Sequence, residues 1–351
     1  MMLVRRLRLS ASLSAAFLLT ACGSNGCTPV AGVPPQQISR LYVAQSGGGT
    51  IFAYALPIGP GSQPIGASYN SQKHYVGIAT DEGGAVYAAN DDPALGASTW
   101  DSFVPFTGVT TPARDELTFA HPHDVAVDRA SHVFVVEQCE ADGPPCHDEM
   151  EVWTSPITLL HFQHSDYQLL LNGSPESLTF DAEGDLWAVF AHSPFIREYV
   201  PPISRSSTPV LQTDGGLAAP PSFVRADRSG NLYVVEQSIG VILYRPPFSP
   251  SMVPAETFSL SSGISTGVAI DADGATYMGN DQGATQLILA FFPTSTVLNT
   301  TLRPPLTNVG SLAIGQGPAG SPIPLMTTPP SATPTPAPSS TPTPMPTPTG
   351  G

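Results

Sequence analysis

The chain has 351 residues, with 13 Lys and Arg against 28 Asp and Glu, which gives a formal net charge of −15. This excess of negative charge argues against binding to a phosphate backbone, so we expect no nucleic acid among the partners. Only 12% of the residues are charged and 41% are hydrophobic, which excludes a highly charged disordered chain, while 32 Gly and 39 Pro predict many turns and few long helices.

The first 21 residues have the layout of a secretory signal. Three arginines precede an apolar run over residues 9–19 that is too short to span a bilayer, and small residues and a cysteine follow. The segment Leu19-Thr20-Ala21-Cys22 resembles the lipobox of bacterial lipoproteins. The resemblance implies a signal peptide over residues 1–21, a lipid anchor on Cys22 that attaches the protein to a membrane, and a lipidated linker over residues 22–37. It also implies a location in the bacterial cell envelope, at the outer membrane where the host has two membranes.

Three more cysteines follow the lipobox. Cys139 and Cys146 lie close together in a stretch that contains Gly and Pro, and Cys27 is left over. Outside the cytoplasm we expect a disulfide between Cys139 and Cys146, with two free thiols as the alternative. A zinc site is less favoured, because no second pair of Cys or His completes its ligand set.

Between residues 38 and 316 one unit is repeated. A short apolar run that ends in Asp occurs five times, with spacings of 47, 53, 46 and 44 residues between the aspartates, which are Asp81, Asp128, Asp181, Asp227 and Asp271. In four copies Gly follows three positions later, and a second β-rich run comes next. Asp caps a tight turn and Gly allows the positive φ that closes a hairpin, so each unit begins with strand, turn, strand. Further apolar runs complete a period that is typical of a four-stranded propeller blade.

The two ends of this region complement each other. Residues 41–44 form a second strand without a first, and residues 311–315 form a first strand without a second. We therefore expect an all-β fold, a six-bladed β-propeller of four-stranded blades over residues 38–316, closed by a C-terminal strand that completes the first blade. Residues 317–351 are rich in Pro and Thr and carry no charge, which predicts a disordered tail.

These repeats resemble the NHL-repeat propellers and, more distantly, the gluconolactonase-like six-bladed family. The second family holds a divalent metal at the mouth of the central channel, with a carboxylate five positions before the repeat Asp. Here that position offers Glu176 and His123, which the resemblance makes candidate catalytic residues. Glu176 would bind Ca²⁺ or another divalent metal together with side chains at the ends of second strands, namely Glu137, Glu236, Asn90 and Asn280.

Two functions stay open beside a purely structural role as a spacer or assembly scaffold. We favour a non-catalytic envelope protein that binds a small molecule, a glycan or a protein partner at the channel mouth, where residues 91–102 and 138–151 should form long loops. The alternative is a metal-dependent lactonase-like hydrolase or lyase, in which His123 or a glutamate moves the proton. The plainer interpretation of the same residues is structural: strand-end carboxylates that face solvent, aspartates that cap turns, and tryptophans that pack between blades.

Overall fold

The computed structural model describes residues 37–45, 48–70, 72–91, 99–106, 108–117, 121–138, 149–155, 165–293, 295–305 and 308–318. The chain divides into two units, residues 1–37 and 38–351, and the strands belong to the second unit except for the first residue of β1. Cys22, Cys27, Cys139 and Cys146 lie outside the described residues, so the lipid anchor and the disulfide stay predictions. The described part of the chain contains no helix long and apolar enough to cross a membrane.

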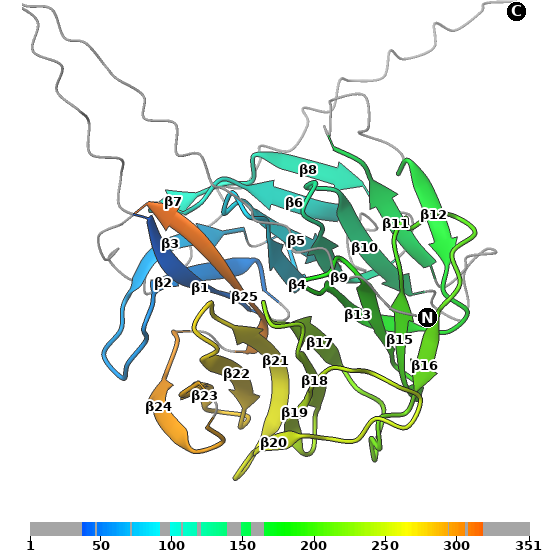
Figure 1. The fold of residues 1–351 in the computed structure, drawn as a ribbon. Coiled ribbons are helices and arrows are strands. Elements are labelled where there is room, and N and C mark those ends of the chain that lie inside the picture. Colours follow the sequence, from blue (N-terminus) through cyan, green and yellow to red (C-terminus); the bar gives the residue numbers. More distant parts are fainter. Residues whose placement is uncertain are drawn as a thin grey trace, which may run out of the picture. The chain divides into compact units, whose positions relative to one another are not determined.

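Six sheets form the six blades of a β-propeller, which confirms the predicted fold class (Figure 1). From the inside outward, blade 1 contains β25 (Val309–Pro318), β1 (Gln37–Gln45), β2 (Thr50–Ala55) and β3 (Pro64–Tyr69). Blade 2 contains β4 (Tyr75–Thr80), β5 (Val86–Asn90), β6 (Thr99–Phe103) and β8 (Arg114–Leu117). Blade 3 contains β9 (His121–Val127), β10 (Val133–Gln138), β11 (Glu149–Trp153) and β12 (Tyr167–Leu170).

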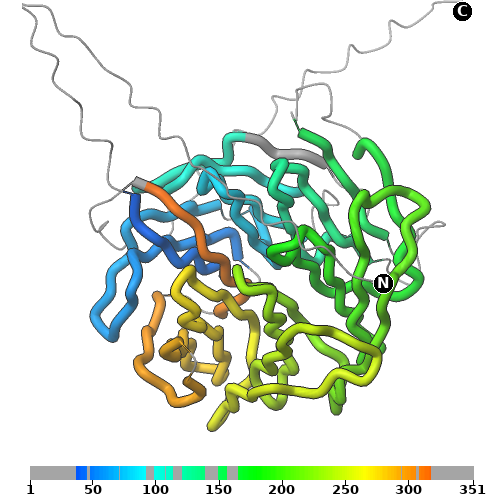
Figure 2. The backbone as a smooth tube through the Cα atoms, viewed as in Figure 1, coloured from blue at the N-terminus to red at the C-terminus, as the bar shows by residue number. Residues whose placement is uncertain are grey.

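Blade 4 contains β13 (Pro175–Phe180), β14 (Leu186–Phe190), β15 (Ser193–Tyr199) and β16 (Leu211–Thr213). Blade 5 contains β17 (Phe223–Ala226), β18 (Leu232–Glu236), β19 (Gly240–Tyr244) and β20 (Glu256–Ser259). Blade 6 contains β21 (Ile264–Ile270), β22 (Thr276–Asp281), β23 (Gln286–Phe291) and β24 (Leu298–Leu302). The tube in Figure 2 shows the blades following one another in chain order.

Blade 1 is built from both ends of the described chain, as the sequence predicts. The C-terminal strand β25 is hydrogen-bonded to β1, and Gln316 Nε2 donates to Ser39 Oγ at 2.9 Å. One detail differs from the expected four strands, because the short strand β7 (Val109–Thr110) pairs in parallel with β3 and widens this sheet to five. The pairing of β25 with β1 closes the ring of blades.

The core lies between neighbouring blades. Six clusters of buried apolar side chains occur, and each combines residues from two adjacent blades. Trp100 and Trp153 meet edge to face at 5.5 Å between blades 2 and 3, and Trp187 is buried between blades 4 and 5. The tryptophans therefore stabilise blade packing, as expected, because alternate side chains of each strand face the next blade.

The repeat aspartates cap turns. Asp181 Oδ1 accepts from the backbone N–H groups of Glu183 and Asp185 at 3.0 and 2.9 Å, and its Oδ2 accepts from Trp187 Nε1 at 2.9 Å. In the copy that lacks the turn glycine, Ser131 adopts the same left-handed region with φ of 61°. These turns lie at one end of the blades, which we call the turn face. The opposite end, where first strands begin and second strands end, is the mouth face.

Candidate functional site

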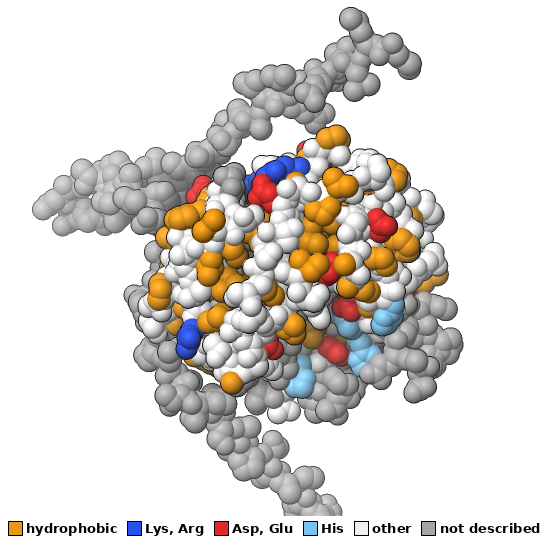
Figure 3. Space-filling view, turned by 90° about the horizontal axis from the view of Figure 1, so that it is seen from below, with side chains coloured by type: hydrophobic (Ala, Val, Ile, Leu, Met, Phe, Trp, Pro, Cys, Tyr) orange, Lys and Arg blue, Asp and Glu red, His pale blue; other side chains and the backbone are white. Residues whose placement is uncertain are grey.

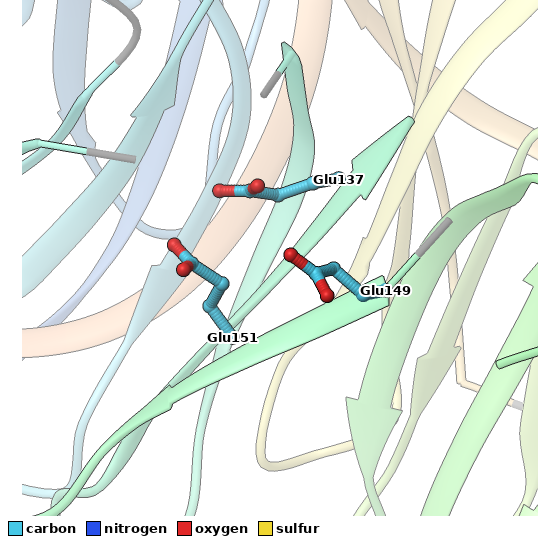
Figure 4. A group of neighbouring side chains, drawn as sticks. All are labelled: Glu137, Glu149 and Glu151. Carbon is cyan, nitrogen blue, oxygen red and sulfur yellow. The ribbon is translucent and has the colours of Figure 1, made fainter. Parts of the chain in front are cut away.

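Three glutamates gather near the mouth face of blade 3. Glu137 ends β10, and the strand register places Glu149 of β11 directly opposite it, with Glu151 two residues further along the same side of β11. One carboxylate oxygen from each residue lies within 4.8 Å of the others. Figure 4 shows the three side chains extending to the same side of these strands. We call this group the glutamate cluster.

Neutral donors hold the glutamate cluster in place. Gln168 on β12 donates from Nε2 to Glu149 Oε1 at 3.0 Å and to Glu151 Oε1 at 3.2 Å. Ser165 Oγ donates to the same oxygen of Glu151 at 3.1 Å. The arrangement fixes at least two of the three carboxylates before any ligand binds.

Burial governs the charge of the cluster. Glu137 and Glu151 are fully buried, and Glu149 is partly exposed. Burial, and then the negative charge of Glu151, raise the pKa of the Glu149 carboxyl to about 7. Because burial and a neighbouring like charge both disfavour the ionised form, Glu149 takes up a proton near neutral pH, and a cation would compete with that proton.

Two histidine–carboxylate pairs lie at the start of β9. His121 Nδ1 is 2.7 Å from Asp91 Oδ1 in blade 2, and His123 Nδ1 is 3.2 Å from Glu176 Oε2 in blade 4. The ladder between β9 and β10 shifts register here and leaves His123 without a pairing partner on β10. Both pairs are partly exposed, at 23 to 32% of each side chain. The predicted catalytic residues His123 and Glu176 are therefore in contact and accessible.

The other predicted metal ligands have separate surroundings. Asn90 Oδ1 accepts from the His74 backbone N–H at 2.6 Å, and Glu236 Oε2 accepts from the Ala218 N–H at 3.2 Å. Asn280 is buried opposite Ser265 on β21. Among the described His, Cys, Asp and Glu side chains, the glutamate cluster is the one group of three with converging ligand atoms, and of the five predicted ligands it contains Glu137 alone.

The sequence interpretation missed Glu149 and Glu151, because residues 138–151 were expected to form a loop. Instead Glu149–Trp153 is the third strand of blade 3, and Thr99–Phe103, which overlaps the other expected loop, is the third strand of blade 2. A signal was present in the alternation of Glu149, Glu151 and Trp153 with Met150 and Val152, which is the period of a strand. The rest of both segments lies outside the described residues.

In Figure 3 the visible histidines lie beside acidic side chains near one rim, while much of the remaining surface is apolar or uncharged. Acidic and imidazole side chains are therefore concentrated on this part of the surface. Such groups carry most of the recognition chemistry on a surface where few residues are charged.

The central channel is closed by an ion pair. Arg225 on β17 reaches across it and donates to both carboxylate oxygens of Asp124 on β9, at 2.7 and 3.0 Å. The same guanidinium donates to Ser177 on β13, Ser311 on β25 and the Ile78 carbonyl on β4. Between Arg225 and the turn face a cavity of about 180 Å³ remains, lined by all six inner strands. The two faces therefore act as separate surfaces.

No family model matches this sequence, and no curated protein matches it. Solved structures do resemble it. A functionally unknown protein from Desulfotomaculum acetoxidans has a TM-score of 0.54 and 9% identity over 81% of this chain and 90% of that chain. A protein of unknown function from Bacteroides caccae scores 0.52 with 9% identity over 79% and 98%, and the WD40 β-propeller domain of Doa1 scores 0.51 with 10% identity over 79% and 86%. At these identities the likeness supports the fold alone.

Proposed function

We propose that this chain is a lipid-anchored protein of the bacterial cell envelope whose propeller binds a divalent cation at the mouth face of blade 3 and catalyses no reaction. The anchor rests on the lipobox-like segment that ends in Cys22. The cation site rests on Glu137, Glu149 and Glu151. The two partly exposed histidine–carboxylate pairs add polar groups on the same face that a ligand can contact.

The observation that carries the proposal is the convergence of three carboxylates, two of them fully buried. Gathering like charges away from water is costly, and a bound cation offsets that cost. The ligand atoms of the cluster are all oxygens, without thiol or imidazole, which favours Ca²⁺ or Mg²⁺ over Zn²⁺. Glu137, Glu149 and Glu151 would hold the ion, with Gln168 and Ser165 orienting two of them.

Burial also favours binding over catalysis. A catalytic metal keeps one coordination position open to the substrate. Here Glu149 alone of the three carboxylates is exposed to solvent, and the other two lie in the packing between blades 2 and 3. A site so enclosed suits an ion that fixes the structure of the mouth face for a further ligand.

The test is a thermal melt of the mature full-length protein in EDTA, then with Ca²⁺, Mg²⁺, Mn²⁺ or Zn²⁺. Binding to the folded state alone adds about 2.7 kcal/mol of stability when the free ion is at 100 times its dissociation constant. We expect Ca²⁺ or Mg²⁺ to raise the melting midpoint, and Glu149→Gln or Glu151→Gln to abolish that rise. Glu183→Gln makes the same charge change at an exposed position on the turn face and should keep it.

Each variant is judged by the difference between its melts with and without ion, because Glu→Gln itself changes stability. Equal midpoints with and without every ion would overturn the proposal. A rise that survives both Glu149→Gln and Glu151→Gln would also overturn it, since the ion would then bind elsewhere.

A metal-dependent lactonase-like hydrolase or lyase is the second candidate. It is favoured by the contact between His123 and Glu176, because an accessible imidazole held by a carboxylate can accept a proton. A bound metal would polarise the reacting carbonyl. Turnover of a lactone that is lost in both His123→Gln and Glu176→Gln, with the ion-induced melting shift unchanged, would establish this activity and replace the non-catalytic proposal.

A further inference from the structure

A groove crosses the turn face between blades 3 and 4. It encloses about 560 Å³. Phe134 and Phe180 form part of its lining, and their rings meet edge to face at 4.8 Å. On one wall Tyr167 donates a hydrogen bond from its hydroxyl to the Ile203 carbonyl at 2.9 Å, next to Pro201 and Pro202. The groove therefore presents aromatic and aliphatic surface.

Five carboxylates line the groove, those of Asp81, Glu82, Asp128, Asp181 and Glu183, against Arg129 and His132, and several of these groups are paired. Arg129 lies 3.8 Å from Glu82 and donates to the Ala182 carbonyl, and His132 Nδ1 lies 2.8 Å from Asp128 Oδ2. An occupant without carboxylates of its own therefore suits the groove, and its apolar side chains would meet the aromatic surface. Extended proline-rich peptides are recognised in this way, because their backbone is preformed and aromatic grooves fit it.

The groove leads to the last strand of the propeller. A second cavity of about 750 Å³ on the same face shares Glu82, Arg129 and Phe180 with the groove and is also lined by Gly315 and Gln316 of β25. A Cβ at Gly84, in the turn after Glu82, would lie 1.8 Å from the Gln316 carbonyl oxygen, so β25 passes directly beside that turn. β25 ends at Pro318, and in Figure 1 it runs from the middle of the blades to their edge.

The chain that follows Pro318 has the composition of such an occupant. Residues 319–351 contain no charged side chain and are mostly Pro, Thr, Ser and Ala. Their aliphatic residues concentrate in Pro322-Ile323-Pro324-Leu325-Met326. At about 3.1 Å per residue in a polyproline helix, Leu325 can lie roughly 22 Å from Pro318.

We propose that the segment Pro322–Met326 of this chain's own tail docks in the groove between blades 3 and 4, with Ile323 and Leu325 against Phe134 and Phe180. The tether favours this occupant over a free peptide, because linked segments meet at a millimolar effective concentration. Docking would cover the turn face and leave the mouth face, with the glutamate cluster, available to ligands. The inference does not depend on the proposed cation site.

The test places a photo-crosslinking benzoylphenylalanine in the full-length chain at Ile203 and, in a separate variant, at Glu183 on the groove's inner side. Mass spectrometry then identifies the peptide that each probe captures. We expect monomeric products joined to residues 319–330. A probe at Val297, which is 73% exposed and directly precedes β24 in blade 6, serves as the control and should capture no tail peptide.

Variants in the tail complete the test without touching the folded blades. Ile323→Asp with Leu325→Asp should lower the crosslinking yield by about tenfold or more, since each buried aliphatic side chain contributes that much binding. Met345→Asp near the end of the tail should leave the yield unchanged. An unchanged yield in the double variant, equal capture from Val297, or crosslinks that join two copies of the chain would each overturn the proposal.

Discussion

Removing the Arg225 side chain should destabilise the propeller more than most single substitutions. Asp124 is fully buried and receives four hydrogen bonds, two of them from the Arg225 guanidinium. Hydrogen bonds to charged groups contribute about 1.5–3 kcal/mol each. Breaking a buried ion pair by removing one partner costs about 3–5 kcal/mol, because the remaining charge is left without compensation. We therefore expect Arg225→Met to lower the free energy of unfolding by about 3–5 kcal/mol.

Equilibrium unfolding in urea, followed by the fluorescence of the three buried tryptophans, measures this loss as a lower midpoint with an unchanged slope. Arg228→Met, at an exposed position on the turn face, is the matched control and should stay within about 0.5 kcal/mol of wild type. Adding Asp124→Asn to Arg225→Met should recover part of the loss, because the uncompensated charge disappears. A loss below about 1 kcal/mol in Arg225→Met would refute the view that this pair holds the inner strands together.

Three other predictions concern positions with clear physical causes. The raised pKa of Glu149, about 7, means that the folded state holds a proton that the unfolded state releases near pH 4.5. The stability of the protein in EDTA should therefore fall as the pH rises through 7. Thermal melts at pH 5 and pH 8 should show a smaller fall in Glu149→Gln than in the wild type. A Cβ at Gly77 would lie 2.5 Å from the Asp124 Cα, so Gly77→Ala should cost about 1–3 kcal/mol in urea unfolding, whereas Gly59→Ala, with no atom within 4 Å, should not. Ser131→Gly should raise stability by about 0.5–1 kcal/mol, since Ser131 is held at a positive φ; a lower urea midpoint would contradict this reasoning.

The repeat pattern was sufficient to predict the blades because each one encodes its own turn. Asp at the end of a first strand and Gly three positions later specify the hairpin locally, whatever surrounds it. The same pattern predicted closure, since the spare strands at the two ends have no other place in a ring. β7 could not be predicted, because a two-residue parallel pairing has no sequence signal of its own.

The site was harder to predict, because its residues meet only through the register of the strands. Glu137 was identified from its place at the end of a second strand. Glu149 and Glu151 were not, because an insertion separates them from β10 and their charge favours a loop interpretation. Asp124 and Arg225 are 101 residues apart, and each is a lone charge within an apolar strand. Only the arrangement of six inner strands around one axis brings them into contact.

The pairing of β25 with β1 has a consequence for how the protein is made. Ser39 and Gln316 are joined across 277 residues, so the ring stays open until β25 has left the ribosome. Until then β1 presents an unpaired edge that other chains can join. Contacts between such distant residues form late and slowly, because a long loop must close first. A nascent chain interrupted before residue 309 would keep this unpaired strand edge and would therefore be prone to aggregation.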